Sequence, residues 1–340
     1  MTVTYDAAPA VPDAAPAGVP PKKGGVRPGL LLKLAITLGL SGYVLWKAGL
    51  ADSLETLGTA SWGWVALAAC SALLAMVLNV RRWQMMLAGL GGAAPLPTLI
   101  RLYLVAMFFN NVLPSRFGGD VVRAYGASIR LTTKTRSAAA VIMDRLVGAI
   151  SVLLLGVIAV TISPSVVPLQ FGGLLVVGLI GGVAVVGVLL ARSPRLGSAW
   201  ALLAHVEKVP LVGRRLRPRV EAAADAIRSY GHDRPLIARA LAISMLANGL
   251  SIVNIYLYSQ SVGANISLAE AAVVTPVVLA VALLPISLNG LGTTELTFVL
   301  LFGAMGVPSD VALAIAILRR LVLLGQSLIG GVLYSARRFG

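Results

Sequence analysis

Long apolar runs separated by short polar segments dominate the chain and determine the elements that it predicts. Six runs are long enough to cross a hydrocarbon core of about 30 Å as a helix that rises 1.5 Å per residue. A helix satisfies its backbone hydrogen bonds internally, so these runs predict transmembrane spans in an all-α polytopic protein. The predicted spans are residues 30–50, 62–80, 137–162, 172–191, 236–260 and 311–335.

Two further apolar stretches, 99–113 and 271–302, are interrupted by Pro and Gly. The first runs into the sequence LPSRFGGD at 113–120, and the second contains LPISLNGLGTTE at 284–295. Because Pro and Gly end or kink helices, each stretch predicts two helices joined by a break. Backbone polar groups at membrane depth are tolerated inside protein or beside a polar cavity, so a matched pair of breaks indicates a transport site.

The composition is that of a membrane protein. Hydrophobic residues make up 58% of the sequence, charged residues make up 12%, and the mean hydropathy is +0.89. A net charge of +15 would suggest nucleic acid as the partner of a soluble protein. In a membrane protein the same excess instead reports topology, so membrane lipids are the expected partners and nucleic acid is not.

The basic residues concentrate on one side of this topology. They occupy the segments 22–27, 81–136, 192–235 and 337–338. The opposite side carries the acidic residues Asp52, Glu55, Glu270 and Asp310. Because positive charge stays on the cytoplasmic side, the pattern places both termini in the cytoplasm and the chain in the cell's inner membrane.

The same asymmetry orients the two interrupted stretches. Basic residues flank residues 99–125 on both sides, which predicts a re-entrant hairpin that enters and leaves from the cytoplasm. Acidic residues flank the second stretch, so that hairpin is expected to enter from outside. Two similar elements of opposite orientation are typical of an inverted-repeat transporter.

The segments outside the spans carry less information. Residues 1–28 are rich in Ala, Pro and Gly and predict a disordered cytoplasmic tail before a membrane domain at 29–336. The basic loop at 192–235 supports two interpretations, a short amphipathic helix on the anionic inner leaflet or a solvated linker.

Charged residues within the spans are the first candidates for a site, because an ionised group at bilayer depth needs a partner or water. Arg319 and Arg320 lie near the middle of the last span, and Asp144 and Arg145 lie inside the third. We expect Glu295 to pair with Arg319, and Asp144 to pair with an arginine of the first hairpin. Two roles remain open for these groups, substrate binding or ion pairs that hold helices in register.

The helix starts at the breaks supply the second set of candidates. A helix that begins near Asp120 would direct free N–H groups toward an anion such as phosphate. The alternative is that Asp120 caps its own helix, which would leave the nearby arginines to bind inner-leaflet lipid without specificity. The candidate binding residues are Arg116, Gly118, Gly119, Asp120, Arg123, Asp144, Arg145, Gly290, Gly292, Glu295, Arg319 and Arg320.

Four ordered motifs together resemble a known family. They are FNNVLPSRFGGDVVRAY at 109–125, DRLVG at 144–148, the LP to GLG to Glu pattern at 284–295, and LR at 318–319. Over residues 30–334 the chain resembles the flippase-like transmembrane domain of lysylphosphatidylglycerol synthases and its stand-alone relatives. In the full synthase a soluble aminoacyl transferase follows this domain, and the membrane part moves the lipid between leaflets.

The chain stops at Gly340 without that transferase, so the resemblance implies lipid movement without lipid aminoacylation. Stand-alone relatives are linked to several envelope lipids, which leaves the headgroup open and suggests envelope-lipid biosynthetic enzymes as partners. We therefore expect a translocase for an anionic lipid or a lipid-linked intermediate. The alternative is a carrier or channel for a small soluble anion.

An intramembrane lipid-modifying enzyme is the less favoured third class. His205 and His232 both lie in the basic loop, and neither an H-E-x-x-H pattern nor a Ser/His arrangement occurs within the spans. Cys70 is the single cysteine, which excludes an internal disulfide. The sequence also lacks G-x-x-x-x-G-K-S/T, so we expect no cofactor, no metal and no direct coupling to ATP.

Overall fold

The computed structural model describes residues 28–113, 118–130, 133–164, 230, 233–284 and 286–336. Within these ranges the chain is helical and contains no strand. By length and composition, five helices can cross a membrane. They are α1 (Pro28–Ala48), α3 (Trp62–Gly89), α6 (Lys134–Ile162), α10 (Arg234–Ser261) and α13 (Ser309–Ala336).

The chain is therefore a multi-pass membrane protein. The helices α3, α10 and α13 each have 28 residues. At 1.5 Å per residue such a helix is about 42 Å long, which exceeds the hydrocarbon core of about 30 Å. Five of the six predicted spans coincide with these helices, and the sixth, 172–191, lies outside the described residues.

The two interrupted stretches form pairs of shorter helices. The first broken unit consists of α4 (Leu96–Val112) and α5 (Gly118–Arg130), which pack against each other. The second broken unit consists of α11 (Leu268–Leu283), the 3-10 turn η4 (Leu288–Gly290) and α12 (Thr293–Ala304). The short helix α2 (Leu50–Gly58) connects α1 to α3.

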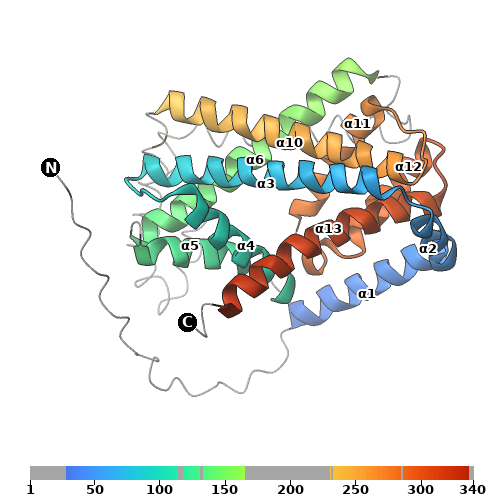
Figure 1. Ribbon diagram of the computed structural model, residues 1–340, viewed down its shortest axis with the longest axis horizontal. Coiled ribbons are helices and arrows are strands. Elements are labelled where there is room, and N and C mark those ends of the chain that lie inside the picture. Colours follow the sequence, from blue (N-terminus) through green and yellow to red (C-terminus); the bar gives the residue numbers. More distant parts are fainter. Residues whose placement is uncertain are drawn as a thin grey trace.

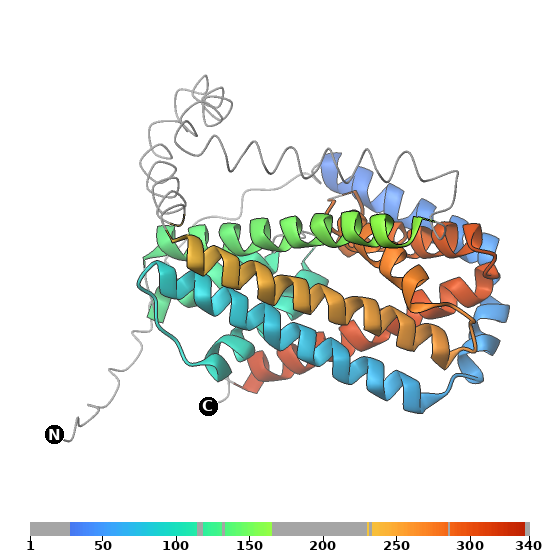
Figure 2. The ribbon, with the colours of Figure 1, turned by 90° about the horizontal axis from the view of Figure 1, so that it is seen from above.

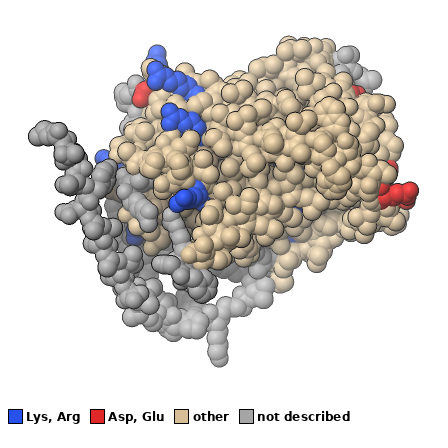
Figure 3. All heavy atoms as spheres, viewed as in Figure 1, with Lys and Arg blue, Asp and Glu red and all other residues tan. Residues whose placement is uncertain are grey.

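The two broken units lie at opposite ends of the bundle (Figures 1 and 2). The first lies where α3 ends and α6 begins, and the second lies where α10 ends and α13 begins. In Figure 3 most of the visible Lys and Arg side chains lie at the end of the first unit, and a cluster of Asp and Glu lies at the other end. The charge asymmetry of the sequence therefore reappears along the long axis of the molecule.

The elements follow the same order in two halves of the chain. The span α3 begins at residue 62 and α10 at residue 234, 172 residues later, and both have 28 residues. The helix α5 begins at residue 118 and α12 at 293, 175 residues later, and the same shift separates α6 at 134 from α13 at 309. Each half thus consists of a span, a broken unit and a second span.

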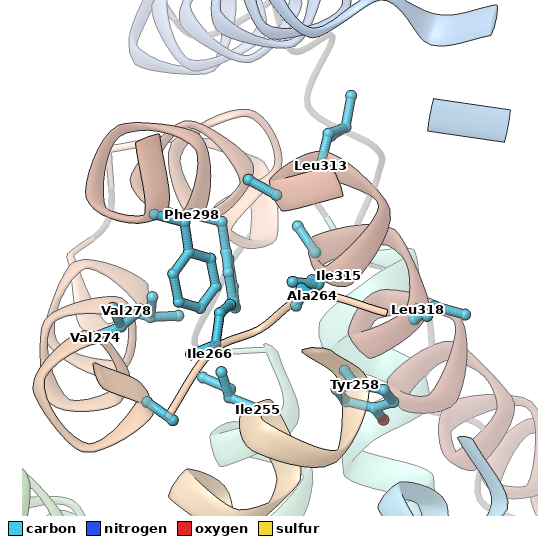
Figure 4. Close-up of a cluster of buried hydrophobic side chains, with 14 of the residues drawn as sticks. Ile255, Tyr258, Ala264, Ile266, Val274, Val278, Phe298, Leu313, Ile315 and Leu318 are labelled. Atoms are coloured by element: carbon cyan, nitrogen blue, oxygen red, sulfur yellow. The ribbon is translucent and has the colours of Figure 1, made fainter. Parts of the chain in front are cut away.

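Two clusters of buried apolar side chains surround the two broken units. Around the first unit, Trp83 of α3 and Leu99 of α4 pack with apolar residues of α5 and α6. Around the second, Phe298 of α12 and Val274 of α11 pack with Ile315 of α13 (Figure 4). Because each unit has its own apolar packing, polar residues can gather between the two.

Local capping explains where several helices begin. The Thr133 hydroxyl accepts a hydrogen bond from the backbone N–H of Arg136 at the start of α6. The Asp233 carboxylate does the same for α10, and Ser267 and Glu270 form a capping box at the start of α11. These side chains satisfy N–H groups that a helix start leaves without partners.

The helices α4 and α13 approach each other closely at Gly330. A Cβ atom at this position would lie 2.0 Å from the backbone oxygen of Leu104. Only glycine allows this approach, and small residues at such contacts are typical of helix packing in membranes. The first broken unit is thereby held directly against the last span.

Candidate functional site

The first break positions its carboxylate through a close backbone turn. A Cβ atom at Gly119 would lie 2.4 Å from the backbone oxygen of Ala106, so α5 starts in direct contact with α4. The Asn110 side chain accepts a hydrogen bond from the Gly119 N–H at 2.7 Å. The Asp120 carboxylate therefore begins α5 at a fixed place beside α6.

Asp120 forms an ion pair with Arg145 of α6. The Arg145 guanidinium donates to both carboxylate oxygens, from Nη2 at 2.9 Å and from Nε at 3.0 Å. Arg123, one helical turn along α5, lies 3.6 Å from the same carboxylate. This two-pronged geometry is the strong form of a carboxylate–guanidinium contact.

Asp144 lies at the centre of a second, fully buried cluster. Its two carboxylate oxygens accept hydrogen bonds at 2.7 Å from Arg82 of α3 and at 2.7 Å from Arg123 of α5. The Arg123 guanidinium also lies 4.4 Å from the ring centre of Trp83 and 5.0 Å from that of Tyr103. The expected pair of Asp144 with an arginine of the first unit is present, and Arg82 is an additional partner.

The second break holds its carboxylate in a similar way. Glu295, near the start of α12, accepts a hydrogen bond from the Gly292 N–H at 2.8 Å. Its other oxygen lies 2.5 Å from Nε of Arg320 on α13. Arg320 also donates to the backbone oxygen of Gly290 at 3.3 Å. The pairs Asp120–Arg145 and Glu295–Arg320 span the same sequence separation of 25 residues.

The expected pair of Glu295 with Arg319 is wrong, because Glu295 pairs with Arg320. Adjacent residues on an α-helix point about 100° apart, since one turn contains 3.6 residues. Arg320 faces α12, and Arg319 is turned toward the interior between α3 and α10. Within the described part of the chain, no carboxylate lies within ion-pair distance of Arg319.

Arg319 faces a polar cavity in the middle of the bundle, here named the inner chamber. Its volume is about 210 Å³, and residues of α3, α4, α10, α11 and α13 line it. The polar lining includes Asn79, Tyr103, Asn254, Tyr258, Arg319 and Gln326. Asn79, Asn254 and Gln326 lie near the middle of their helices, so the chamber lies at mid-depth of the predicted membrane.

Two buried polar groups of this chamber lack good hydrogen bonds. The Gln326 amide nitrogen has no partner among the described residues. The Tyr258 hydroxyl has no bond of good geometry, although the Asn254 side chain lies within electrostatic reach. Buried polar groups are usually paired, and unpaired ones at a cavity indicate a ligand that completes them.

A second cavity of about 120 Å³ lies where the two breaks meet, and we name it the tip cavity. The Asn289 side chain donates a hydrogen bond to that of Asn111 at the end of α4, so the two broken units touch tip to tip. Arg320 and Thr294 also line the tip cavity. Arg319 lines both cavities and therefore stands at their junction.

The predicted backbone donors are only partly available. The N–H of Gly119 already donates to Asn110, and that of Gly292 donates to Glu295. Gly290 contributes its carbonyl oxygen to Arg320. The Asp120 carboxylate pairs with Arg145, and Arg116 lies outside the described residues.

Sequence reasoning missed Arg82 and the polar lining of the inner chamber. The predicted span ended at residue 80, which placed Arg82 in a cytoplasmic segment, whereas α3 continues to residue 89 and buries it. The apolar residues that follow, Trp83, Met85 and Met86, could have indicated the longer helix. Gln326 carries no such signal, because polar residues in spans also serve in helix contacts.

Comparison with known proteins agrees with this architecture. The family described as the lysylphosphatidylglycerol synthase TM region matches residues 30–330. The chain belongs to this family. A UPF0104 membrane protein of Pyrococcus horikoshii is 23% identical over 332 residues, covering 91% of this chain and 97% of the relative. A UPF0104 membrane protein of Methanocaldococcus jannaschii is also 23% identical, covering 86% of this chain and 89% of the relative.

Proposed function

We propose that this family member moves an anionic lipid headgroup between the leaflets of the inner membrane, through a site at Arg319. The observation that carries the proposal is the placement of Arg319 at the junction of two cavities without a carboxylate partner among the described residues. Arg82, Arg123, Arg145 and Arg320 each have one. A charge at membrane depth is costly without a partner, and an anionic substrate would supply it.

The surroundings of the tip cavity favour a lipid over a soluble anion. Leu324 lines this cavity and is 38% exposed, and Leu113 and Leu284 beside the two breaks are exposed as well. In a bilayer, exposed apolar side chains face acyl chains. A headgroup can therefore reach Arg319 from the side while its chains stay in the hydrocarbon region.

The two broken units supply the moving parts of the proposal. We propose that they are re-entrant hairpins of an inverted repeat, because the halves share one order of elements and the units lie at opposite ends. The pairs Asp120–Arg145 and Glu295–Arg320 then open in turn as a phosphate passes. Their carboxylates release and re-pair the arginines, so that one side of the site is closed at a time.

The test is leaflet exchange in proteoliposomes. Acyl-chain-labelled phosphatidylglycerol, a zwitterionic lipid and a polyprenyl phosphate are compared by impermeant quenching of the outer leaflet. We expect exchange of the anionic lipid, its loss in Arg319→Ala, and its retention in Arg101→Ala, which removes an exposed arginine of α4. Exchange that persists in folded Arg319→Ala would refute the site. Uptake of soluble phosphate without lipid exchange would establish the soluble-anion carrier instead.

The proposed topology has a separate test. Gly306 lies in the turn between α12 and α13, at the end opposite to the basic residues. A cysteine placed there in a Cys70→Ser background should react with an impermeant maleimide in intact cells. Labelling that requires permeabilised cells would reverse the orientation and place both termini outside.

A further inference from the structure

The inner chamber has room for a headgroup but not for a whole lipid. Its volume is about 210 Å³, below the range of about 300–1,000 Å³ for pockets that enclose drug-sized ligands. Arg319 lies at its junction with the tip cavity, whose rim is exposed and apolar. A lipid phosphate at Arg319 would therefore direct its acyl chains toward the rim and its remaining headgroup into the chamber.

The chamber offers both donors and acceptors of hydrogen bonds. The Gln326 amide nitrogen and the Tyr258 hydroxyl are donors without good partners. The Ser251 and Thr275 hydroxyls donate to backbone oxygens of their own helices, which leaves their lone pairs as acceptors. A hydroxyl group both donates and accepts, so a group with several hydroxyls matches this lining.

The chamber does not match a cationic headgroup. None of the described residues that line the inner chamber or the tip cavity is a carboxylate. The nearby Glu295 already pairs with Arg320. An ammonium group in the chamber would lie beside the positive Arg319 and would lack a counter-charge, which is unfavourable in a buried site.

Resting on the proposed function, we infer that the inner chamber selects lipids whose phosphate carries an uncharged, hydroxyl-rich group, and that it rejects headgroups with an ammonium. The phosphate binds at Arg319, and the hydroxyls bind at Tyr258 and Gln326. Both a phosphatidyl polyol and a polyprenyl phosphoryl sugar have this chemistry. The chamber therefore discriminates by the charge of the headgroup beyond the phosphate.

The experiment compares lipids that share acyl-chain label and chain length. Phosphatidylglycerol, lysyl-phosphatidylglycerol, phosphatidylethanolamine and phosphatidic acid are each measured for leaflet exchange in the same proteoliposomes. We expect phosphatidylglycerol to exchange at least about tenfold faster than either ammonium lipid, and faster than phosphatidic acid, which lacks hydroxyls for the chamber. Competition by an unlabelled polyprenyl phosphoryl sugar or by phosphatidylinositol then distinguishes the two sources of the chemistry.

Variants of the chamber separate selectivity from transport. Tyr258→Phe and Gln326→Leu each remove one neutral hydrogen bond and should lower the preference for phosphatidylglycerol over phosphatidic acid by about two- to tenfold. Phosphatidic acid exchange should remain, and Tyr43→Phe, which changes an exposed tyrosine of α1, should leave the preference unchanged.

The outcomes distinguish this inference from the proposed function. Equal exchange of lysyl-phosphatidylglycerol and phosphatidylglycerol, or variants that slow every lipid alike, would overturn the inference. The proposed function would stand in that case if exchange still required Arg319. Exchange that does not depend on Arg319 would overturn both.

Discussion

Replacing Asp144 by alanine should destabilise the protein strongly, because this carboxylate neutralises two buried guanidinium groups. Asp144 is 1% exposed and accepts hydrogen bonds at 2.7 Å from both Arg82 and Arg123. Asp144→Ala leaves both arginines buried without their counter-charge. Breaking a buried pair in this way costs about 3–5 kcal/mol. The loss links three helices, since Arg82 belongs to α3, Arg123 to α5 and Asp144 to α6.

Asp120→Ala is the matched control for this prediction. It removes a carboxylate of the same first half, but its partner Arg145 has a side chain that is 42% exposed. Partly exposed pairs contribute about 1 kcal/mol or less. The two variants therefore differ in burial and not in the type of charge that is removed.

The assay is reversible unfolding in mixed micelles with increasing sodium dodecyl sulfate, followed by circular dichroism. Asp144→Ala should lower the free energy of unfolding by about 3–5 kcal/mol, and Asp120→Ala by about 1 kcal/mol or less. A triple variant, Arg82→Met, Arg123→Met and Asp144→Leu, should recover most of the loss, because well-packed apolar groups replace buried ion clusters at little cost. A loss below about 1 kcal/mol for Asp144→Ala would refute the stabilising role argued here.

Three further predictions concern close approaches in the bundle. Gly330→Ala should lower the free energy of unfolding by about 1–3 kcal/mol, because its Cβ would meet the backbone of α4; Gly325→Ala on the same helix has open space and should be neutral in the same titration. Gly292→Ala should cost at least about 1–2 kcal/mol, because this residue has φ +79° and touches the backbone of α1. Cross-linking Asn111→Cys to Asn289→Cys with a short bifunctional reagent should stop lipid exchange, and undiminished exchange after complete cross-linking would show that the tips need not separate.

The sequence predicts the elements of the fold well because hydrophobic length is a local property. Five predicted spans coincide with long helices, and both predicted breaks separate pairs of shorter helices. Helix ends near charged residues are harder to predict. The end of α3 shows why, since Arg82 is charged and yet buried against Asp144, a partner 62 residues away in the chain.

The pairing of charges depends on how helices are rotated, which no local pattern contains. Arg319 and Arg320 are neighbours in sequence, and only the packing of α13 against α12 decides that Arg320 meets Glu295. The polar lining of the inner chamber is likewise a product of assembly. Tyr258 and Gln326 come from α10 and α13, and nothing in either segment alone indicates that both face one cavity.

Asp144 and Arg319 occupy corresponding places in the two halves of the chain. Residue 319 follows residue 144 by 175 positions, which is also the shift between the starts of α6 at 134 and α13 at 309. In the first half this place holds a carboxylate that two arginines neutralise. In the second half it holds an arginine, a cavity and, among the described residues, no carboxylate within ion-pair distance. The first half is therefore neutralised from within the protein, and the second is the half at which an anion from outside can complete the charge balance.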